Sequence, residues 1–180
     1  MKLSPSALSL SVAALVAAGS LASAQIERLD LAQMVAKTDN SLLGTIVGKE
    51  VIRIDHPIDG PELYYTTLTI EGTSLKDGKA MTVDVTFPGG FIDETHGVYN
   101  SEAPSADDIK TGNRIVAFYK WSDNMGGDLA ANALYASHGG LYRTFDTRRD
   151  VIVQGRGEGY AISNNLSLTQ LRQDVQRLAK

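Results

Sequence analysis

Apolar and polar residues alternate along most of the chain between residues 41 and 154, which is typical of strands with one buried face. The alternation is unbroken from Met81 to Phe87, where four apolar side chains share one face. Runs of Gly, Pro, Asn and Asp separate such segments, as expected for turns. The pattern predicts strands over residues 41–55, 64–71, 81–87, 114–121, 132–137, 141–146 and 151–154.

Two glycines, Gly44 and Gly48, interrupt the first of these strands. A glycine inside a strand marks a bulge, a tight bend or the close approach of another backbone. A strand that bends sharply fits a barrel better than a flat sheet, because barrel strands tilt and coil around a common axis. The first strand therefore favours a barrel.

Helical spacing marks both ends of this region. Within residues 26–37, Asp30 is placed as an N-cap and Gln33 as its partner in a capping box. Near the C-terminus, Ser167 and Gln170 have the same spacing. An apolar stripe of helical period follows, formed by Leu168, Leu171, Val175 and Leu178. Each end is predicted to form a short helix that packs on the sheet.

These patterns predict an all-β domain with flanking helices. It would be a single OB-like, partly closed β-barrel over residues 25–180, with one helix at each end. No internal repeat and no linker divides this region. A domain of this length buries roughly 68–70% of its unfolded surface. The chain has no cysteine, so stability must come from packing and from the sheet.

The first 24 residues have the order of a secretory signal peptide. Lys2 precedes a run of small and apolar residues that ends in Ala22-Ser23-Ala24, an A-x-A cleavage site. Serines and a glycine interrupt the run, which makes it a poor membrane anchor. We expect cleavage before Gln25, export to the periplasm or the medium, and no membrane span in the mature chain.

A long segment, Phe91 to Lys110, separates two strongly apolar strands. Connections of this length are usually functional or disordered, and binding residues often lie on loops held by a rigid scaffold. One hypothesis makes the start of this loop a recognition surface, with candidate ligand-binding residues Phe91, Asp93, Glu94, His96 and Tyr99. In the alternative, Phe91, Val98 and Tyr99 plug one end of the barrel.

The sequence gives little support to catalysis or metal binding. The three histidines are scattered, with no H-E-x-x-H pair, and the acidic loops lack the spacing of a calcium loop. There is no G-x-S-x-G nucleophile motif. We therefore expect no catalytic residue, no metal and no cofactor. Strand aromatics fill the barrel or, on an exposed face, stack a sugar or a peptide.

The formal net charge of −4 and the absence of a basic run disfavour nucleic acid as a partner. The remaining partners are an unknown protein or a small molecule. The residues favour an exported, non-catalytic binding or interaction module. A secreted hydrolase or metal-dependent enzyme and a protease-inhibitor-like domain remain as alternatives.

The order of the segments resembles a family of uncharacterised exported bacterial proteins. The segments that carry the resemblance are "SLLGTIVGKEV", "YYTTLTIEGTSLKDGKAMTVDVTFPGG", "GNRIVAFY", "HGGLYRTF" and "LSLTQLRQDVQRL". The resemblance covers nearly all of residues 25–180 and brings no catalytic residue with it.

More distantly, the layout is similar to the netrin-like domain of the tissue inhibitors of metalloproteinases. That resemblance implies a five-stranded OB-like barrel flanked by helices. Those inhibitors use an N-terminal cysteine to hold the protease zinc, whereas this chain has no cysteine. The resemblance therefore implies the barrel and not the inhibitory mechanism.

Overall fold

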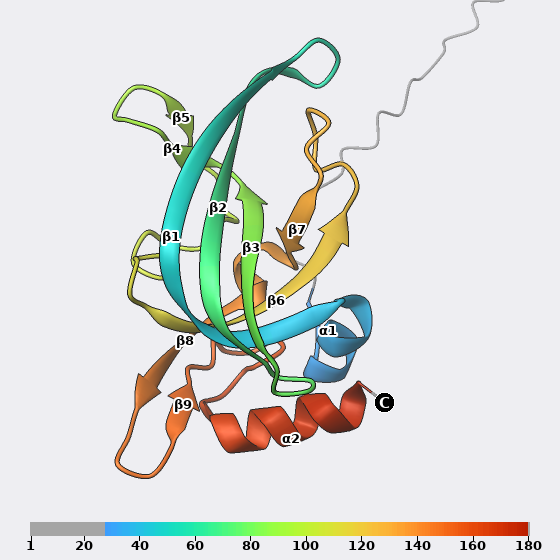
Figure 1. Cartoon of the computed structure of the whole chain (residues 1–180), viewed down its shortest axis with the longest axis vertical. Coiled ribbons are helices and arrows are strands. Elements are labelled where there is room, and N and C mark those ends of the chain that lie inside the picture. Colours follow the sequence, from blue (N-terminus) through green and yellow to red (C-terminus); the bar gives the residue numbers. More distant parts are fainter. Residues whose placement is uncertain (1–27, 180) are drawn as a thin grey trace, which may run out of the picture.

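The computed structural model describes residues 28–179, so the predicted signal peptide and its cleavage site lie outside the described residues. The described chain is mostly β, with one helix near each end (Figure 1). The elements in chain order are α1 (Leu31–Lys37), β1 (Asn40–His56), β2 (Gly60–Ser74), β3 (Ala80–Pro88), β4 (Gly90–Phe91), β5 (Gly97–Val98), β6 (Arg114–Ser122), β7 (Ala131–Leu134), the 3-10 helix η1 (Ser137–Gly140), β8 (Leu141–Asp146), β9 (Val151–Val153), β10 (Leu166–Ser167) and α2 (Leu168–Leu178).

Five strands close into a mixed barrel in the order β1-β2-β3-β7-β6, with β6 returning to β1. The long strand β1 closes it, because its residues 40–45 pair with β6 on one side while β2 pairs on the other side from Leu42 to His56. The neighbours are antiparallel except β3 and β7, which pair in parallel at Thr86 and Ala133. The predicted OB-like barrel is confirmed, and the ring of strands is complete.

The two glycines of β1 explain how this strand bends around the barrel (Figure 1). A side chain at Gly44 would place its Cβ 2.6 Å from the carbonyl oxygen of Glu71 on β2, so only glycine permits this approach. The register with β2 then shifts between Ile46 and Gly48, which leaves Val47 as the extra residue of a bulge. The predicted bulge is therefore present.

Two apolar cores lie on opposite sides of the sheet. The first fills the barrel, and its buried members are Leu42, Ile46, Leu68, Ile70, Val85, Phe87, Ile109, Ile115, Ala117, Tyr119, Leu134 and Leu141. The second lies between the sheet and the two helices, and its buried members are Leu29, Met34, Leu43, Leu75, Val116, Phe118, Tyr142, Val153, Ile162, Leu168, Leu171 and Val175. In Figure 1, α1 and α2 lie side by side under one end of the barrel.

The helix caps follow the predictions with one correction. Asp30 caps α1 and forms the complete capping box with Gln33, although the helix starts at Leu31 and residues 28–30 lie outside it. Ser167 caps α2 by accepting a hydrogen bond from the Gln170 backbone N–H. The Gln170 side chain instead donates to Asp174, so the predicted second capping box is only half formed. Between residues 28 and 179, no helix is long and apolar enough to span a membrane.

The predicted strands are all present, with different bounds. The segment predicted as a strand over 132–137 ends at Leu134, because Ala136 and Ser137 take a left-handed backbone conformation that begins η1. The predicted loop from Phe91 contains a small hairpin, β4–β5, which pairs through Gly90 and Val98 and through Phe91 and Gly97. This hairpin projects from the end of the barrel that faces away from the helices (Figure 1).

Candidate functional site

A cavity of about 580 Å³ lies at the end of the barrel that the long loop covers. We call it the loop-end cavity. Its apolar lining comes from Val51, Phe87, Phe91, Val98, Ala103, Pro104, Ala106 and Ile109. Its charged and polar lining comes from Lys49, Thr66, Tyr99, Asn100, Ser101, Ser105, Asp108, His138 and Arg156, with Gly90 between them. A volume of this size lies within the range of about 300–1,000 Å³ that is usual for small-molecule sites.

The bulge in β1 decides which side chains face this cavity. Directly paired residues of antiparallel strands point to the same side of the sheet. Lys49 pairs with Leu68 and Val51 pairs with Thr66, whereas Ile46, before the bulge, pairs with Ile70. The extra residue thus turns the odd-numbered side chains of β1 inward, and it brings a charged lysine to the cavity.

The chain leaves β3 along a path that is fixed by hydrogen bonds. The Thr66 hydroxyl donates to the Gly89 carbonyl oxygen at 2.6 Å, and the Gly89 N–H donates to the Tyr64 carbonyl oxygen at 2.7 Å. Gly90 has a φ of 132°, and a side chain there would collide with Thr66 and press on Val51. The β4–β5 hairpin can therefore start beside the cavity because residue 90 is a glycine.

After the hairpin, the loop covers the barrel end with a few anchored residues. Asn100 donates from its amide to the Pro88 carbonyl oxygen and accepts from the Glu102 N–H. Pro104 and Ile109 are buried, and Ile109 belongs to the barrel core. Phe91 and Val98 remain about half exposed and Tyr99 is 79% exposed. The second half of the loop thus closes the barrel, and the hairpin residues line its outer rim.

An arginine from a distant part of the chain forms one wall of the cavity. The Nε of Arg156 donates to the Leu141 carbonyl oxygen at 2.8 Å, and one Nη donates to the Asp108 carboxylate at 2.9 Å. Its guanidinium group also lies 5.9 Å from the centre of the Tyr142 ring, a cation–π contact. Burial raises the pKa of the Tyr142 hydroxyl, so this ring stays uncharged beneath the arginine.

His138 lines the cavity with both ring nitrogens in use. Its Nδ1 lies 2.9 Å from the Glu102 carbonyl oxygen, which only accepts, so Nδ1 carries the proton. Its Nε2 then accepts a hydrogen bond of 2.8 Å from the Tyr160 hydroxyl. Both nitrogens therefore serve to hold η1 and the loop against the segment that follows β9.

The structure divides the predicted ligand-binding residues into two groups. Phe91 and Tyr99 line the loop-end cavity. Asp93, Glu94 and His96 lie at the exposed turn between β4 and β5, away from the cavity lining. The Asp93 carboxylate accepts hydrogen bonds from the Thr95 and His96 backbone N–H groups, and these contacts hold its pKa well below the usual range. Asp93 and His96 thus shape the turn itself.

Sequence reasoning missed Lys49, Asp108, His138 and Arg156 as members of this site. The pairing of Asp108 with Arg156 joins residues 48 positions apart, which no local pattern reveals. Arg156 lies between two glycines, Gly155 and Gly157, and the path of the chain there brings its side chain back over Leu141. A charged residue in the inward-facing register of β1 was the available signal, and the position of the bulge was needed to recognise it.

The three histidines lie in separate parts of the structure. His56 lies at the end of β1 between Asp59 and Asp128, His96 lies beside Asp93, and His138 lies in the loop-end cavity. Among residues 28–179, no three His, Asp or Glu side chains are grouped closely enough to hold a metal ion.

OB barrels commonly bind oligonucleotides and oligosaccharides on the outer face of strands 2 and 3, between the β1–β2 connection and the loop before the last barrel strand. Here these two connections are tied together. The Gly127 N–H donates to Asp59 at 2.7 Å, and His56 lies 3.2 Å from Asp128. The Tyr65 hydroxyl also donates to the Met125 carbonyl oxygen at 2.8 Å. The connection between β6 and β7 therefore covers the outer face of β2 near Tyr65.

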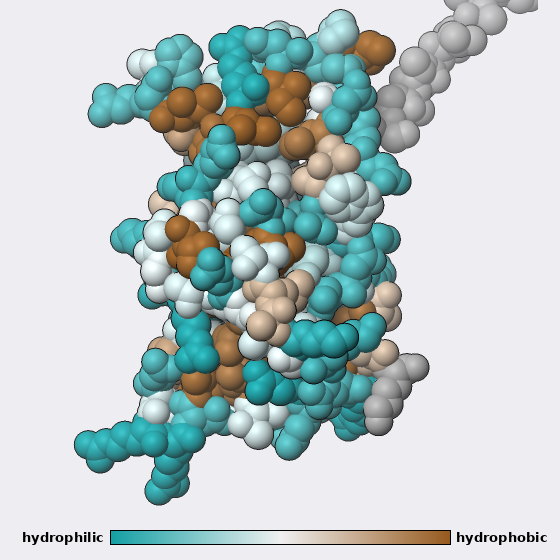
Figure 2. All heavy atoms as spheres, in the orientation of Figure 1, coloured by the Kyte–Doolittle hydropathy of each residue, from teal (hydrophilic) through white to brown (hydrophobic). Residues whose placement is uncertain are grey.

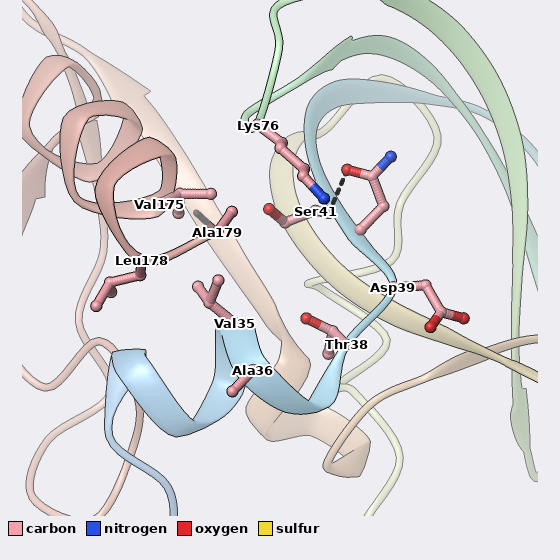
Figure 3. Close-up of a pocket in the computed structure, with 10 residues that line it drawn as sticks. Val35, Ala36, Thr38, Asp39, Ser41, Lys76, Val175, Leu178 and Ala179 are labelled. Carbon is pink, nitrogen blue, oxygen red and sulfur yellow. Dashed lines mark hydrogen bonds between the residues drawn. The ribbon is translucent and has the colours of Figure 1, made fainter.

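A second, smaller cavity of about 240 Å³ lies between the two helices and the barrel (Figure 3). Val35 from α1 and Val175 and Leu178 from α2 form its apolar side, and Lys76 reaches toward it from the β2–β3 turn. It lies next to the packed helix core, whereas the loop-end cavity lies beside exposed apolar residues. Figure 2 shows apolar side chains gathered over β4, β5 and the upper part of β1, at the end of the barrel away from the helices.

No protein-family model matches the sequence, and neither a curated protein nor a solved structure matches it. The resemblance to uncharacterised exported bacterial proteins and to the netrin-like domain therefore stays a prediction.

Proposed function

We propose that this protein is an exported, non-catalytic binding module that holds a small molecule in the loop-end cavity. The observation that carries the proposal is the cavity itself, about 580 Å³ in volume and lined on one side by apolar residues of β1, β3 and the loop. Binding sites are concave and mostly apolar, with a few polar groups that orient the ligand. Export to the periplasm or the medium is part of the proposal and rests on residues 1–24.

Two features support binding rather than catalysis. Asp108 is paired with Arg156, and both ring nitrogens of His138 are in hydrogen bonds with neighbouring protein groups. These hydrogen bonds hold the loop and the wall of the cavity together, which favours a rigid receptor.

The position of the exposed apolar residues supports the same site. Phe91, Ile92, Val98 and Tyr99 are exposed on or beside the β4–β5 hairpin. Three of these four residues line the loop-end cavity. Exposed apolar groups around a hollow are typical of ligand-binding grooves. The hydrogen bonds between the β1–β2 and β6–β7 connections cover part of the outer face of β2. The loop-end cavity is therefore a better candidate for a ligand site than that outer face.

The proposal can be tested with two fluorescent probes that share one apolar body, N-phenyl-1-naphthylamine and its sulfonate, 8-anilinonaphthalene-1-sulfonate. Ala106→Trp and Ser101→Trp each place a large side chain at an exposed residue that lines the cavity. Ala80→Trp is the matched control, at an exposed residue near the helix end of β3. We expect binding of at least one probe in the parent and the control, and its loss in both blocking variants.

Circular dichroism melts establish that all three variants are folded before binding is measured. If neither probe shows binding that the two blocking variants remove, the loop-end cavity is not a receptor and the proposed function is wrong.

A further inference from the structure

The hydrogen bonds around the loop-end cavity show which of its polar groups remain available. The Thr66 hydroxyl is engaged with the Gly89 carbonyl oxygen, and Asn100 is engaged with Pro88 and Glu102. His138 uses both ring nitrogens. These groups therefore build the wall, and a ligand would gain little by competing for them.

The hydroxyl groups of Tyr99, Ser101 and Ser105 also remain available as neutral donors, and the two cationic side chains add charged ones. No ion pair or hydrogen bond within residues 28–179 occupies the Lys49 ammonium group. Arg156 uses two of its five N–H donors, one on Leu141 and one on Asp108. Both side chains line the same cavity, so its spare hydrogen-bonding capacity is mainly that of charged donors.

The charge of the cavity also differs from that of the chain. The lining contains two cations, Lys49 and Arg156, and one carboxylate, Asp108, whereas the whole chain has a formal net charge of −4. A ligand with one negative charge would balance the lining. A dianion would be repelled more strongly by Asp108, which lies within hydrogen-bonding distance of the guanidinium group.

We propose that the ligand of this cavity is an organic monoanion with an apolar body, such as a carboxylate or sulfonate joined to a chain or ring. The head group is held by Lys49 and the spare donors of Arg156, and the body lies along Val51, Phe91 and Val98. Arginine is well suited to this task because its planar donors match two oxygens of one anion. This inference names the ligand class of the proposed function and rests on it.

The same two probes provide the test, because they differ only in the sulfonate. We expect the parent to bind 8-anilinonaphthalene-1-sulfonate about tenfold or more tightly than N-phenyl-1-naphthylamine, since hydrogen bonds to charged groups are stronger than neutral ones. Only binding that Ala106→Trp removes is counted. This condition excludes attachment of the sulfonate to lysines elsewhere on the surface.

Two sets of variants measure the contributions of Lys49 and Arg156 to sulfonate binding separately. Lys49→Gln removes an exposed, unpaired charge, and Lys120→Gln on β6 makes the same change away from the cavity. The double variant Arg156→Gln, Asp108→Asn removes both partners of the ion pair, so that no partly buried charge is left without its partner. We expect Lys49→Gln and the double variant each to reduce the preference for the sulfonate over the neutral probe about tenfold, with Lys120→Gln silent.

The outcomes distinguish this inference from the function on which it rests. Equal affinities for the two probes in the cavity, or a sulfonate preference that survives both sets of variants, would overturn the monoanion and leave the receptor intact. If the parent shows no probe binding that the blocking variants remove, the proposed receptor function itself is wrong.

Discussion

The two ends of the barrel are closed in different ways. At the helix end, α1 and α2 bury Met34, Leu171 and Val175 against the outer side of the sheet. At the loop end, residues 100–110 cover the barrel. Only Pro104 and Ile109 of this segment are buried, and the loop-end cavity lies beside them. The helices leave a cavity of about 240 Å³ beside the barrel, whereas the irregular loop leaves one of about 580 Å³ at the other end. We therefore expect stability to depend mainly on the helix end and, under the proposed function, ligand binding to depend on the loop end.

The free energy of unfolding should be most sensitive to the loss of a buried side chain at the helix end. Leu171→Ala removes a fully buried side chain from the helix core and should lower the free energy of unfolding by about 2–5 kcal/mol, measured by urea unfolding. Leu178→Ala makes the same substitution at an exposed position of the same helix and should cost much less. Equal effects of the two would mean that α2 is not docked. Below the melting temperature, probe binding at the loop end should persist in both.

The next effect concerns the cap of the same helix. Ser167→Ala removes the hydroxyl that accepts the Gln170 N–H, and it should cost about 1 kcal/mol in the free energy of unfolding. Ser163→Ala, at an exposed residue outside the helix, is the matched control and should be close to silent. A Ser167→Ala melt that overlays the parent would show that the cap is replaced by water without loss.

At the loop end, the same kind of truncation should act on binding instead of stability. Phe91→Ala removes a half-exposed ring that lines the cavity, so the free energy of unfolding should change by no more than about 0.5 kcal/mol. Probe affinity should fall roughly fivefold, from the loss of about 1 kcal/mol of apolar contact. Phe145→Ala on β8 is a similarly exposed control outside the cavity. A large loss of stability with unchanged binding would make Phe91 a plug of the barrel.

The smallest effect is a local dependence on pH at the β4–β5 turn. Hydrogen bonds from the Thr95 backbone, and then from His96 and the Thr95 side chain, lower the pKa of Asp93 in the folded state. The carboxylate form is therefore the one that the folded turn favours. Its contribution is fully present above the unfolded pKa of about 3.9 and is lost as the pH falls through the lower folded value.

Amide NMR signals of Thr95 and His96 should shift only well below a pH of about 3.9, where the folded turn takes up the proton, while those of α2 should follow the global unfolding. Asp93→Asn should remove most of this local dependence. A turn that titrates identically in the parent and in Asp93→Asn would show that Asp93 does not hold it.

The sequence predicted the barrel because its evidence is local. Alternating residues such as Val83 and Val85 mark strands, and polar residues such as Asp30 and Ser167 mark helix starts, whatever the rest of the chain does. The half-formed box at Gln170 shows the limit of such evidence, because Asp174 competes for the same side chain one turn further along α2.

The site was less accessible to sequence reasoning. The loop was recognised by its length, yet the two-residue strands of its hairpin are too short to show a period. The sequence placed a bulge near Gly44 or Gly48, but which side of β1 faces inward depends on the residue that is inserted. Lys49 becomes a cavity residue only once Val47 is known to be the bulge. Arg156 required the tertiary path of the chain after β9.

An amide NMR titration with 8-anilinonaphthalene-1-sulfonate can test the proposal that the loop end is the receptor and the helix end is not. We expect the largest shifts at Val51, Gly90, Val98 and Ser101, with α1 and α2 unaffected. Shifts concentrated instead around Val35 and Val175, or on the outer face of β2 at Thr67 and Thr69, would contradict it.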